Sequence, residues 1–124
     1  MDRDEIHILL VENDESTRKL LRDGLEGMSG LPVRIDEAAD GAEGLEAIRA
    51  LRPDLVLLDL VMPRVSGLGL LLSLQEDPPP KLPRIVVLSR VSAEEVVEQV
   101  LDLGVDFFFQ KPVQLRELAA VIRS

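Results

Sequence analysis

Polar side chains that could carry chemistry follow four short apolar runs. They are Glu12, Asn13 and Asp14 after the first run, Asp59 after the second, Ser89 after the third and Lys111 after the fourth. Clustered carboxylate and amide oxygens suit a hard dication such as Mg2+. An aspartate beside that ion is a poor base, but it can attack phosphorus once the phosphoryl oxygens are neutralised. Lys111 would add a second positive contact and Ser89 a hydrogen-bond donor. Together these residues predict a phosphoryl-transfer site.

The elements expected to position these residues are strands buried on both faces. Residues 8–11, 55–58, 85–88 and 107–109 are apolar at consecutive positions, which is typical of a parallel sheet. Residues 33–37 alternate instead, which indicates a strand nearer a sheet edge. We therefore also expect Phe107 and Phe109 to pack in the core. Polar residues after parallel strands meet in the crevice at the carboxyl end of the sheet.

Segments with helical spacing lie between these runs. Their apolar positions are Leu20, Leu21, Leu25 and Met28; Ala42, Leu45, Ile48 and Leu51; Val96, Val97, Val100, Leu101 and Leu103; and Leu115, Leu118, Ala119 and Ile122. Residues 68–74 are assigned to a helix by their position. Ser92 and Glu95 form a capping box, and Asp40 and Glu43 have the same form. Strands alternating with helices must run parallel, so the predicted order is (βα)5.

Composition narrows the function class. The chain has 124 residues, of which 46% are hydrophobic and 30% charged, as expected for one globular domain over residues 1–124. It has no cysteine and one histidine, which excludes thiolate zinc sites and histidine clusters. A net charge of −9 disfavours direct nucleic-acid binding. No apolar stretch is long enough to cross a bilayer, so we expect no membrane partner and a cytoplasmic location.

The sequence resembles the receiver domain of two-component response regulators, which are CheY-like. The resemblance spans residues 8 to about 123. Its motifs are residues 10–14, Asp59 followed by Met62, Pro63 and Gly67, residues 87–89, and Lys111 with Pro112. It implies a flavodoxin-like, doubly wound parallel sheet of strand order 2-1-3-4-5.

By this resemblance, Asp59 would accept a phosphoryl group from a partner histidine kinase or histidine phosphotransfer protein. Mg2+, or Mn2+, would be held by Glu12, Asn13, Asp59 and the carbonyl of Val61. Ser89 and Lys111 would bind the phosphoryl oxygens, and the Lys111–Pro112 peptide bond would be cis.

The resemblance also implies a switch and an output. Ser89 and Phe108 would transmit phosphorylation to the face formed by the fourth helix, fifth strand and fifth helix. An output protein or domain would read that face. The sequence leaves the cognate kinase, the output and the oligomeric state open.

Two residues depart from the family pattern. Asn13 stands where a second acid is usual, so the metal site loses one negative charge, and Asp14 is an alternative ligand from the next position. Arg90 stands where a small residue is usual. We hypothesise that the Arg90 guanidinium shields the phosphoryl group and slows its hydrolysis, the alternative being a side chain turned to solvent.

Three alternative protein classes are a degenerate receiver, a dehalogenase-like phosphatase and a flavodoxin. A degenerate receiver, binding partners without phosphorylation, is favoured by Asn13 and opposed by Asp59, Ser89 and Lys111. A dehalogenase-like phosphatase needs an acid two residues after its nucleophile, where this chain has Val61. A flavodoxin needs a phosphate loop that the acidic residues after the first strand do not supply. The single histidine, His7, lies at the opposite end of its strand, which favours a structural or exposed role.

Overall fold

The computed structural model describes residues 5–60, 66–90 and 94–124. Strands and helices alternate strictly along the described chain. The strands are β1 (Ile6–Val11), β2 (Val33–Ala38), β3 (Leu55–Asp59), β4 (Arg84–Ser89) and β5 (Phe107–Gln110). The helices are α1 (Glu15–Glu26), α2 (Gly41–Leu51), α3 (Gly67–Glu76), α4 (Glu94–Asp102) and α5 (Leu115–Arg123). All five predicted strands are present, and each is one or two residues longer than predicted.

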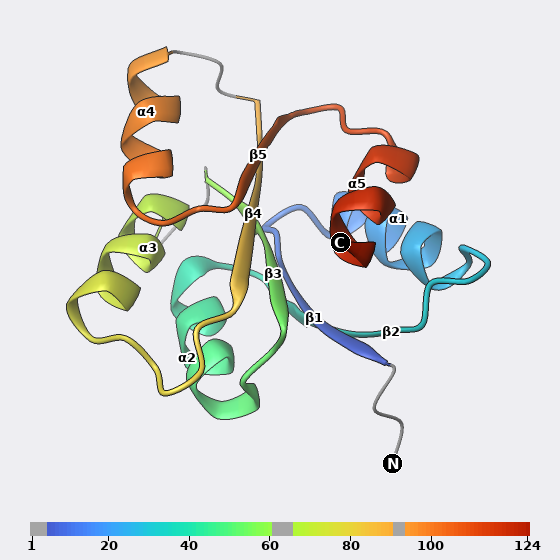
Figure 1. Cartoon of the computed structure of the whole chain (residues 1–124), viewed down its shortest axis with the longest axis horizontal. Coiled ribbons are helices and arrows are strands. Elements are labelled where there is room, and N and C mark those ends of the chain that lie inside the picture. Colours follow the sequence, from blue (N-terminus) through green and yellow to red (C-terminus); the bar gives the residue numbers. More distant parts are fainter. Residues whose placement is uncertain (1–4, 61–65, 91–93) are drawn as a thin grey trace.

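The strands form one parallel sheet of order β2-β1-β3-β4-β5. Figure 1 shows α1 and α5 on one side of this sheet and α2, α3 and α4 on the other. This arrangement confirms the predicted flavodoxin-like fold and its strand order. No helix in the described part of the chain is both long and apolar enough to span a membrane.

Consecutive strand residues are apolar because the sheet is covered on both faces. In β1, Leu9 and Val11 belong to the hydrophobic cluster under α2, α3 and α4, whereas Ile8 and Leu10 belong to the cluster under α1 and α5. The four residues are at most 1% exposed. Burying both faces stabilises the sheet by roughly 1.5–3 kcal/mol for each large aliphatic side chain. In the inner strands β1, β3 and β4 the polar residues are therefore at or next to the strand ends.

The edge strand β5 differs from the expectation of a fully buried core. Phe107 is 41% exposed, so the prediction that it packs in the core is wrong. Its ring stacks on that of Phe109, with centroids 6.5 Å apart. Phe108 packs against the cluster under α3 and α4, and Phe109 against the opposite cluster. The outer strand receives less helical cover than the three inner strands, which is why its first residue reaches solvent.

Three leucines assigned to apolar helix faces also lie at the surface: Leu20 is 70%, Leu51 44% and Leu101 46% exposed. The prediction that these three leucines face the core is wrong, because neighbouring residues such as Leu21 and Ile48 already fill the space above the sheet. Leu20 instead lines a surface hollow that it shares with Arg90.

Side-chain caps define where several helices begin. Asp40 accepts a hydrogen bond from the Glu43 amide at 2.9 Å, as its capping-box pattern predicts. The Glu43 carboxylate accepts from the Ala39 amide at 3.3 Å, one residue earlier than in a standard box. Helix α4 begins at Glu94, and the predicted cap, Ser92, lies outside the described residues.

His7 lies at the amino end of β1 and is 8% exposed. Its Nε2 is 2.6 Å from the Asp36 carboxylate, and the Arg34 guanidinium donates a hydrogen bond to its Nδ1 at 2.9 Å. Its backbone amide donates to Asp54 at 2.8 Å. These contacts join β1 to β2 and to the start of β3, in agreement with a structural role for His7.

Candidate functional site

The carboxyl ends of β1, β3, β4 and β5 place the predicted residues at one edge of the sheet. The ladder pairs Val11 with Leu58, Asp59 with Leu88, and Ser89 with Gln110, so the polar residues that end these strands are neighbours. Glu12, Asp59 and Lys111 border a cleft of about 450 Å³, here called the acidic cleft. It is lined by Glu12, Asn13, Asp14, Thr17, Asp59, Arg90 and Lys111.

Lys111 connects the two buried acids of the acidic cleft. Its Nζ donates a hydrogen bond to Glu12 Oε1 at 2.5 Å and lies 3.7 Å from Asp59 Oδ2. Glu12 is 3% and Asp59 9% exposed. Two carboxylates are tolerated there because a cation and hydrogen bonds offset the loss of hydration. The second Glu12 oxygen accepts from the Asp14 amide at 3.2 Å.

The position of Lys111 is fixed by the backbone as well as by its charge. Its amide donates to the Ser89 carbonyl at 2.7 Å, and its peptide bond with Pro112 is cis, as expected. Ser89 is completely buried at the end of β4. Lys111, Ser89 and Asp59 therefore stand at the ends of three adjacent strands.

Asp14 is already engaged in capping α1. Its carboxylate accepts from the Thr17 amide at 3.0 Å and from the Thr17 hydroxyl at 2.5 Å. These hydrogen bonds hold the pKa of Asp14 below its usual value of 3.8, and Lys111 and Arg90 act in the same direction by charge. The Asn13 side chain, by contrast, is exposed at the cleft. Asn13 is thus better placed than Asp14 to offer a ligand oxygen.

The donor set fits a weakly held hard dication. Two buried carboxylates, those of Glu12 and Asp59, and the amide oxygen of Asn13 are the oxygen ligands that Mg2+ accepts while keeping several waters. Within residues 5–60, 66–90 and 94–124, no three His, Cys, Asp or Glu side chains are grouped to hold a metal. The set thus carries one acid fewer than such a group. Val61, whose carbonyl was predicted as a ligand, lies outside the described residues, as do Met62 and Pro63.

Position 67 of the motif requires glycine because the backbone of β3 lies too close for a side chain. A Cβ on Gly67 would lie 2.4 Å from the carbonyl oxygen of Asp59 and 2.7 Å from Leu60 Cα. Its amide donates to the Leu60 carbonyl at 3.0 Å. The first turn of α3 therefore packs directly on the backbone that carries Asp59, and a side chain there would displace it.

Sequence reasoning missed Thr17 and the pairing of Lys111 with Glu12. Asp14 followed three residues later by Thr17, at the start of a helix, is a capping pattern that would have revealed the first. The second joins residues 99 apart in the chain, and no local signal predicts it. Arg90 lines the cleft with an exposed side chain, which is compatible with both of its predicted roles. Phe108 lies in β5 on the α4 side.

Comparisons with known proteins agree with this geometry. The family model of the response regulator receiver domain matches residues 8–123. Response regulator MprA of Mycolicibacterium vanbaalenii is 39% identical over 119 residues, which are 96% of this chain and 49% of that protein. The chain thus spans about half the length of the curated relatives it matches.

Solved structures agree in fold and sequence. The signal receiver domain of the putative response regulator NarL from Mycobacterium tuberculosis is 27% identical, with a TM-score of 0.85, over 96% of this chain and 94% of that one. A CheY-like receiver domain from Methanospirillum hungatei is 28% identical, with a TM-score of 0.81, over 95% and 90%. The chain belongs to the response regulator receiver domain family of two-component signalling.

Proposed function

We propose that this chain accepts a phosphoryl group on Asp59 from a histidine kinase, or from a histidine phosphotransfer protein, in the cytoplasm. The observation that carries the proposal is the Lys111 ammonium group, which contacts Glu12 and lies 3.7 Å from Asp59 within one cleft. A carboxylate beside an ammonium group and a second acid can attack phosphorus while the charge on the phosphoryl oxygens is offset.

Residues of the acidic cleft, together with the neighbouring Ser89, have distinct roles in this reaction. Asp59 forms the new P–O bond as the P–N bond of the donor phosphohistidine breaks, and the imidazole nitrogen keeps the electron pair. Lys111 and the Ser89 hydroxyl bind the phosphoryl oxygens. Glu12, Asp59 and Asn13 would hold Mg2+ or Mn2+, with the Val61 carbonyl as a further ligand. The dication would supply charge neutralisation at the phosphoryl group.

The signal leaves through the face formed by α4, β5 and α5. Ser89 moves toward the phosphoryl group and Phe108 turns inward, which reshapes that face for a downstream protein or domain. Phe108 is half-buried against the cluster under α4, so its movement is coupled to the packing of that helix. The domain acts as a signal carrier, with no separate substrate, and its net charge of −9 opposes direct contact with nucleic acid or anionic membranes.

The test is phosphorylation by a small donor. Acetyl phosphate and Mg2+ should raise the intact mass of the wild-type chain by one phosphoryl group and leave Asp59→Asn unchanged. Lys111→Ala should still fold. It should be phosphorylated far more slowly than wild type, because the positive charge beside Asp59 is lost. Labelling of Asp59→Asn at the wild-type level, or no labelling of either chain, would contradict the proposal.

The second candidate is a degenerate receiver that binds its partner without phosphorylation. It is favoured by the exposed amide of Asn13 and by the engagement of Asp14 with Thr17, which together leave two carboxylates for a dication. The same labelling experiment separates the two candidates. A wild-type chain that stays unlabelled while Asn13→Asp becomes labelled identifies the degenerate receiver.

Arg90 is proposed to prolong the phosphorylated state. Arg90 lines the same cleft as Asp59 and Lys111, and its guanidinium group would shield the phosphoryl group from water. Arg90→Ala should lose its phosphoryl group several-fold faster than wild type. Arg49→Ala, which removes the same charge from the last turn of α2, is the matched control and should keep the wild-type rate. Equal rates for all three chains would exclude this role of Arg90.

A further inference from the structure

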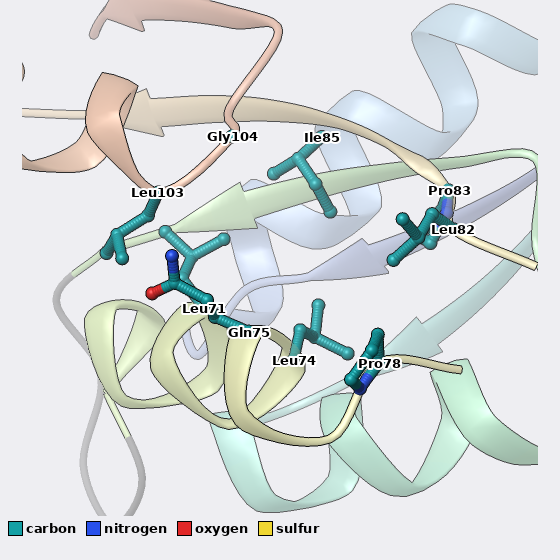
Figure 2. Close-up of a pocket in the computed structure, with 9 residues that line it drawn as sticks. All are labelled: Leu71, Leu74, Gln75, Pro78, Leu82, Pro83, Ile85, Leu103 and Gly104. Carbon is teal, nitrogen blue, oxygen red and sulfur yellow. The ribbon is translucent and has the colours of Figure 1, made fainter. Parts of the chain in front are cut away.

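A groove between α3 and α4 lies at the opposite end of the sheet from Asp59. Figure 2 shows its walls: α3, the segment leading into β4, and the turn after α4. The groove, here called the apolar groove, has a volume of about 290 Å³ and is lined chiefly by Leu71, Leu74, Leu82, Pro83, Ile85 and Leu103.

The apolar groove exists because α4 does not pack closely on its neighbour. Helix α3 packs against α2, whereas no comparable packing joins α3 to α4 in the described part of the chain. The floor, formed by Leu71, Leu74 and Ile85, is at most 6% exposed. At its mouth Leu82 is 67% exposed, a large apolar side chain left in water. An exposed leucine over an apolar floor is a feature of surfaces that receive another apolar group.

The charges around the apolar groove are mainly negative. Glu76 and Asp77 end α3 beside it, and Asp102 precedes Leu103 at its other wall. These acids are exposed, and Asp77 forms an ion pair with Arg49 at 3.7 Å.

Lys81 and Arg84, which flank the groove-lining residues Leu82 and Pro83 in the sequence, point away from the groove. Lys81 is bound to Asp54 at 2.6 Å, and Arg84 donates to the carbonyls at the end of α5, reaching Ile122 at 3.1 Å. Asp77 is partly neutralised by Arg49, so the rim offers chiefly the carboxylates of Glu76 and Asp102 to an incoming ligand. Such a rim favours a ligand that is apolar on one side and positively charged on the other.

We propose that the apolar groove binds a cationic amphipathic helix of a partner protein. Its volume is at the lower end of the roughly 300–1,000 Å³ range of small-molecule pockets, and it suits a few anchoring side chains better than a whole ligand. A helix presents such anchors at spacings of three and four residues, with flanking charges free to meet the rim. This site is separate from the acidic cleft and does not depend on phosphorylation of Asp59.

The test uses a fluorescein-labelled amphipathic peptide with leucine on one face and lysine elsewhere. Fluorescence anisotropy should show saturable binding to the wild-type chain. A peptide with the same leucines and glutamate in place of lysine should bind at least tenfold more weakly, because the rim repels it. Amide NMR shifts should concentrate at Ile85, Leu103 and Gly104.

A matched pair of variants locates the binding. Leu82→Lys places a cation at the mouth of the groove and should weaken binding of the lysine peptide about tenfold or more, by removing apolar contact and adding repulsion. Leu20→Lys makes the same charge change at a leucine of equal exposure outside the groove, 70% against 67%, and should bind within twofold of wild type.

Three results would overturn the proposal. They are no saturable binding of the lysine peptide, equal binding by Leu82→Lys and wild type, and a wild-type dimer in sedimentation that Leu82→Lys dissociates, since a second copy would then occupy the groove. Both variants are at exposed positions, and circular dichroism should show wild-type folding for each.

Discussion

Replacing Gly67 by alanine tests whether the start of α3 fixes the backbone of Asp59. The new Cβ would lie 2.4 Å from the Asp59 carbonyl oxygen and 2.7 Å from Leu60 Cα, whereas attractive contacts between such atoms occur at about 3.5–4.0 Å. The contacted atoms belong to the backbone and cannot rotate away. Relief therefore requires movement of the end of β3 or of the first turn of α3.

The expected size of the effect follows from these contacts. Forcing a methyl group into a filled space costs about 1–3 kcal/mol, and the helix preference of alanine returns less than about 1 kcal/mol at the first helical residue. Gly67→Ala should lower the free energy of unfolding by about 2 kcal/mol, which is roughly 8 °C in Tm for a chain of this size. Phosphorylation of Asp59 by acetyl phosphate should slow as well, because its carboxylate moves relative to Lys111.

Gly24→Ala is the matched control for this experiment. A Cβ on Gly24 would also lie 2.4 Å from a neighbour, but that neighbour is Cδ1 of Leu115, the end of a flexible side chain. Rotation of Leu115 should limit the change in unfolding free energy to about 1 kcal/mol in either direction. Urea unfolding followed by circular dichroism measures both variants. Equal stability of Gly67→Ala and wild type, or equal losses in the two variants, would refute the argument.

Three further predictions follow from the structure. Asn13→Asp should raise Mg2+ affinity about ten- to a hundredfold by calorimetry, since an exposed unit charge about 4 Å from a dication is worth about 2 kcal/mol in water; unchanged affinity would exclude Asn13 as a ligand. Burial tends to raise the pKa of Asp54, but hydrogen bonds from Lys81 and the His7 amide lower it overall. The stability that Asp54 contributes is therefore complete above pH 3.8 and is lost as the pH falls through the lower folded value, so urea titrations should show Asp54→Asn approaching wild type in acid. Phe108→Ala should lose about 2–3 kcal/mol and Phe107→Ala about 1 kcal/mol of unfolding free energy; the reverse order would contradict the burial of β5.

The inner strands of the sheet could be predicted from the sequence, because a strand buried on both faces is an unbroken run of apolar residues. Residues 8–11 and 55–58 read as inner strands and are inner strands. Their ends were set one or two residues short, since His7 and Asp59 are polar yet still take part in the ladder. Phe107 was misjudged for the converse reason, because an apolar residue on an edge strand can lack a covering helix.

The sequence predicted which residues meet at the site, because the order of the strands determines that. Glu12, Asp59, Ser89 and Lys111 come together because each follows a parallel strand, and the sequence contains the four strands. What each side chain contacts could not be predicted in this way. The Asp14 carboxylate can either accept hydrogen bonds from Thr17 or face the cleft. Local geometry decides between the two, and the sequence does not show that geometry.

Counting acids in the sequence therefore overstates the negative charge that the cleft can offer to a cation. Glu12 is held by Lys111 at 2.5 Å and Asp14 by Thr17, and Asn13 is neutral. Lys111 lies closer to Glu12 than to Asp59, 2.5 Å against 3.7 Å, so a movement of its ammonium group toward Asp59 would lengthen its contact with Glu12. A cation that binds Glu12 instead of Lys111 would lower the cost of moving Lys111, because the buried Glu12 carboxylate would keep a positively charged partner. If Asp59 is phosphorylated as proposed, the same two contacts would link cation binding at Glu12 to the movement of Lys111 toward Asp59, and the neutral side chain at position 13 would weaken that cation binding.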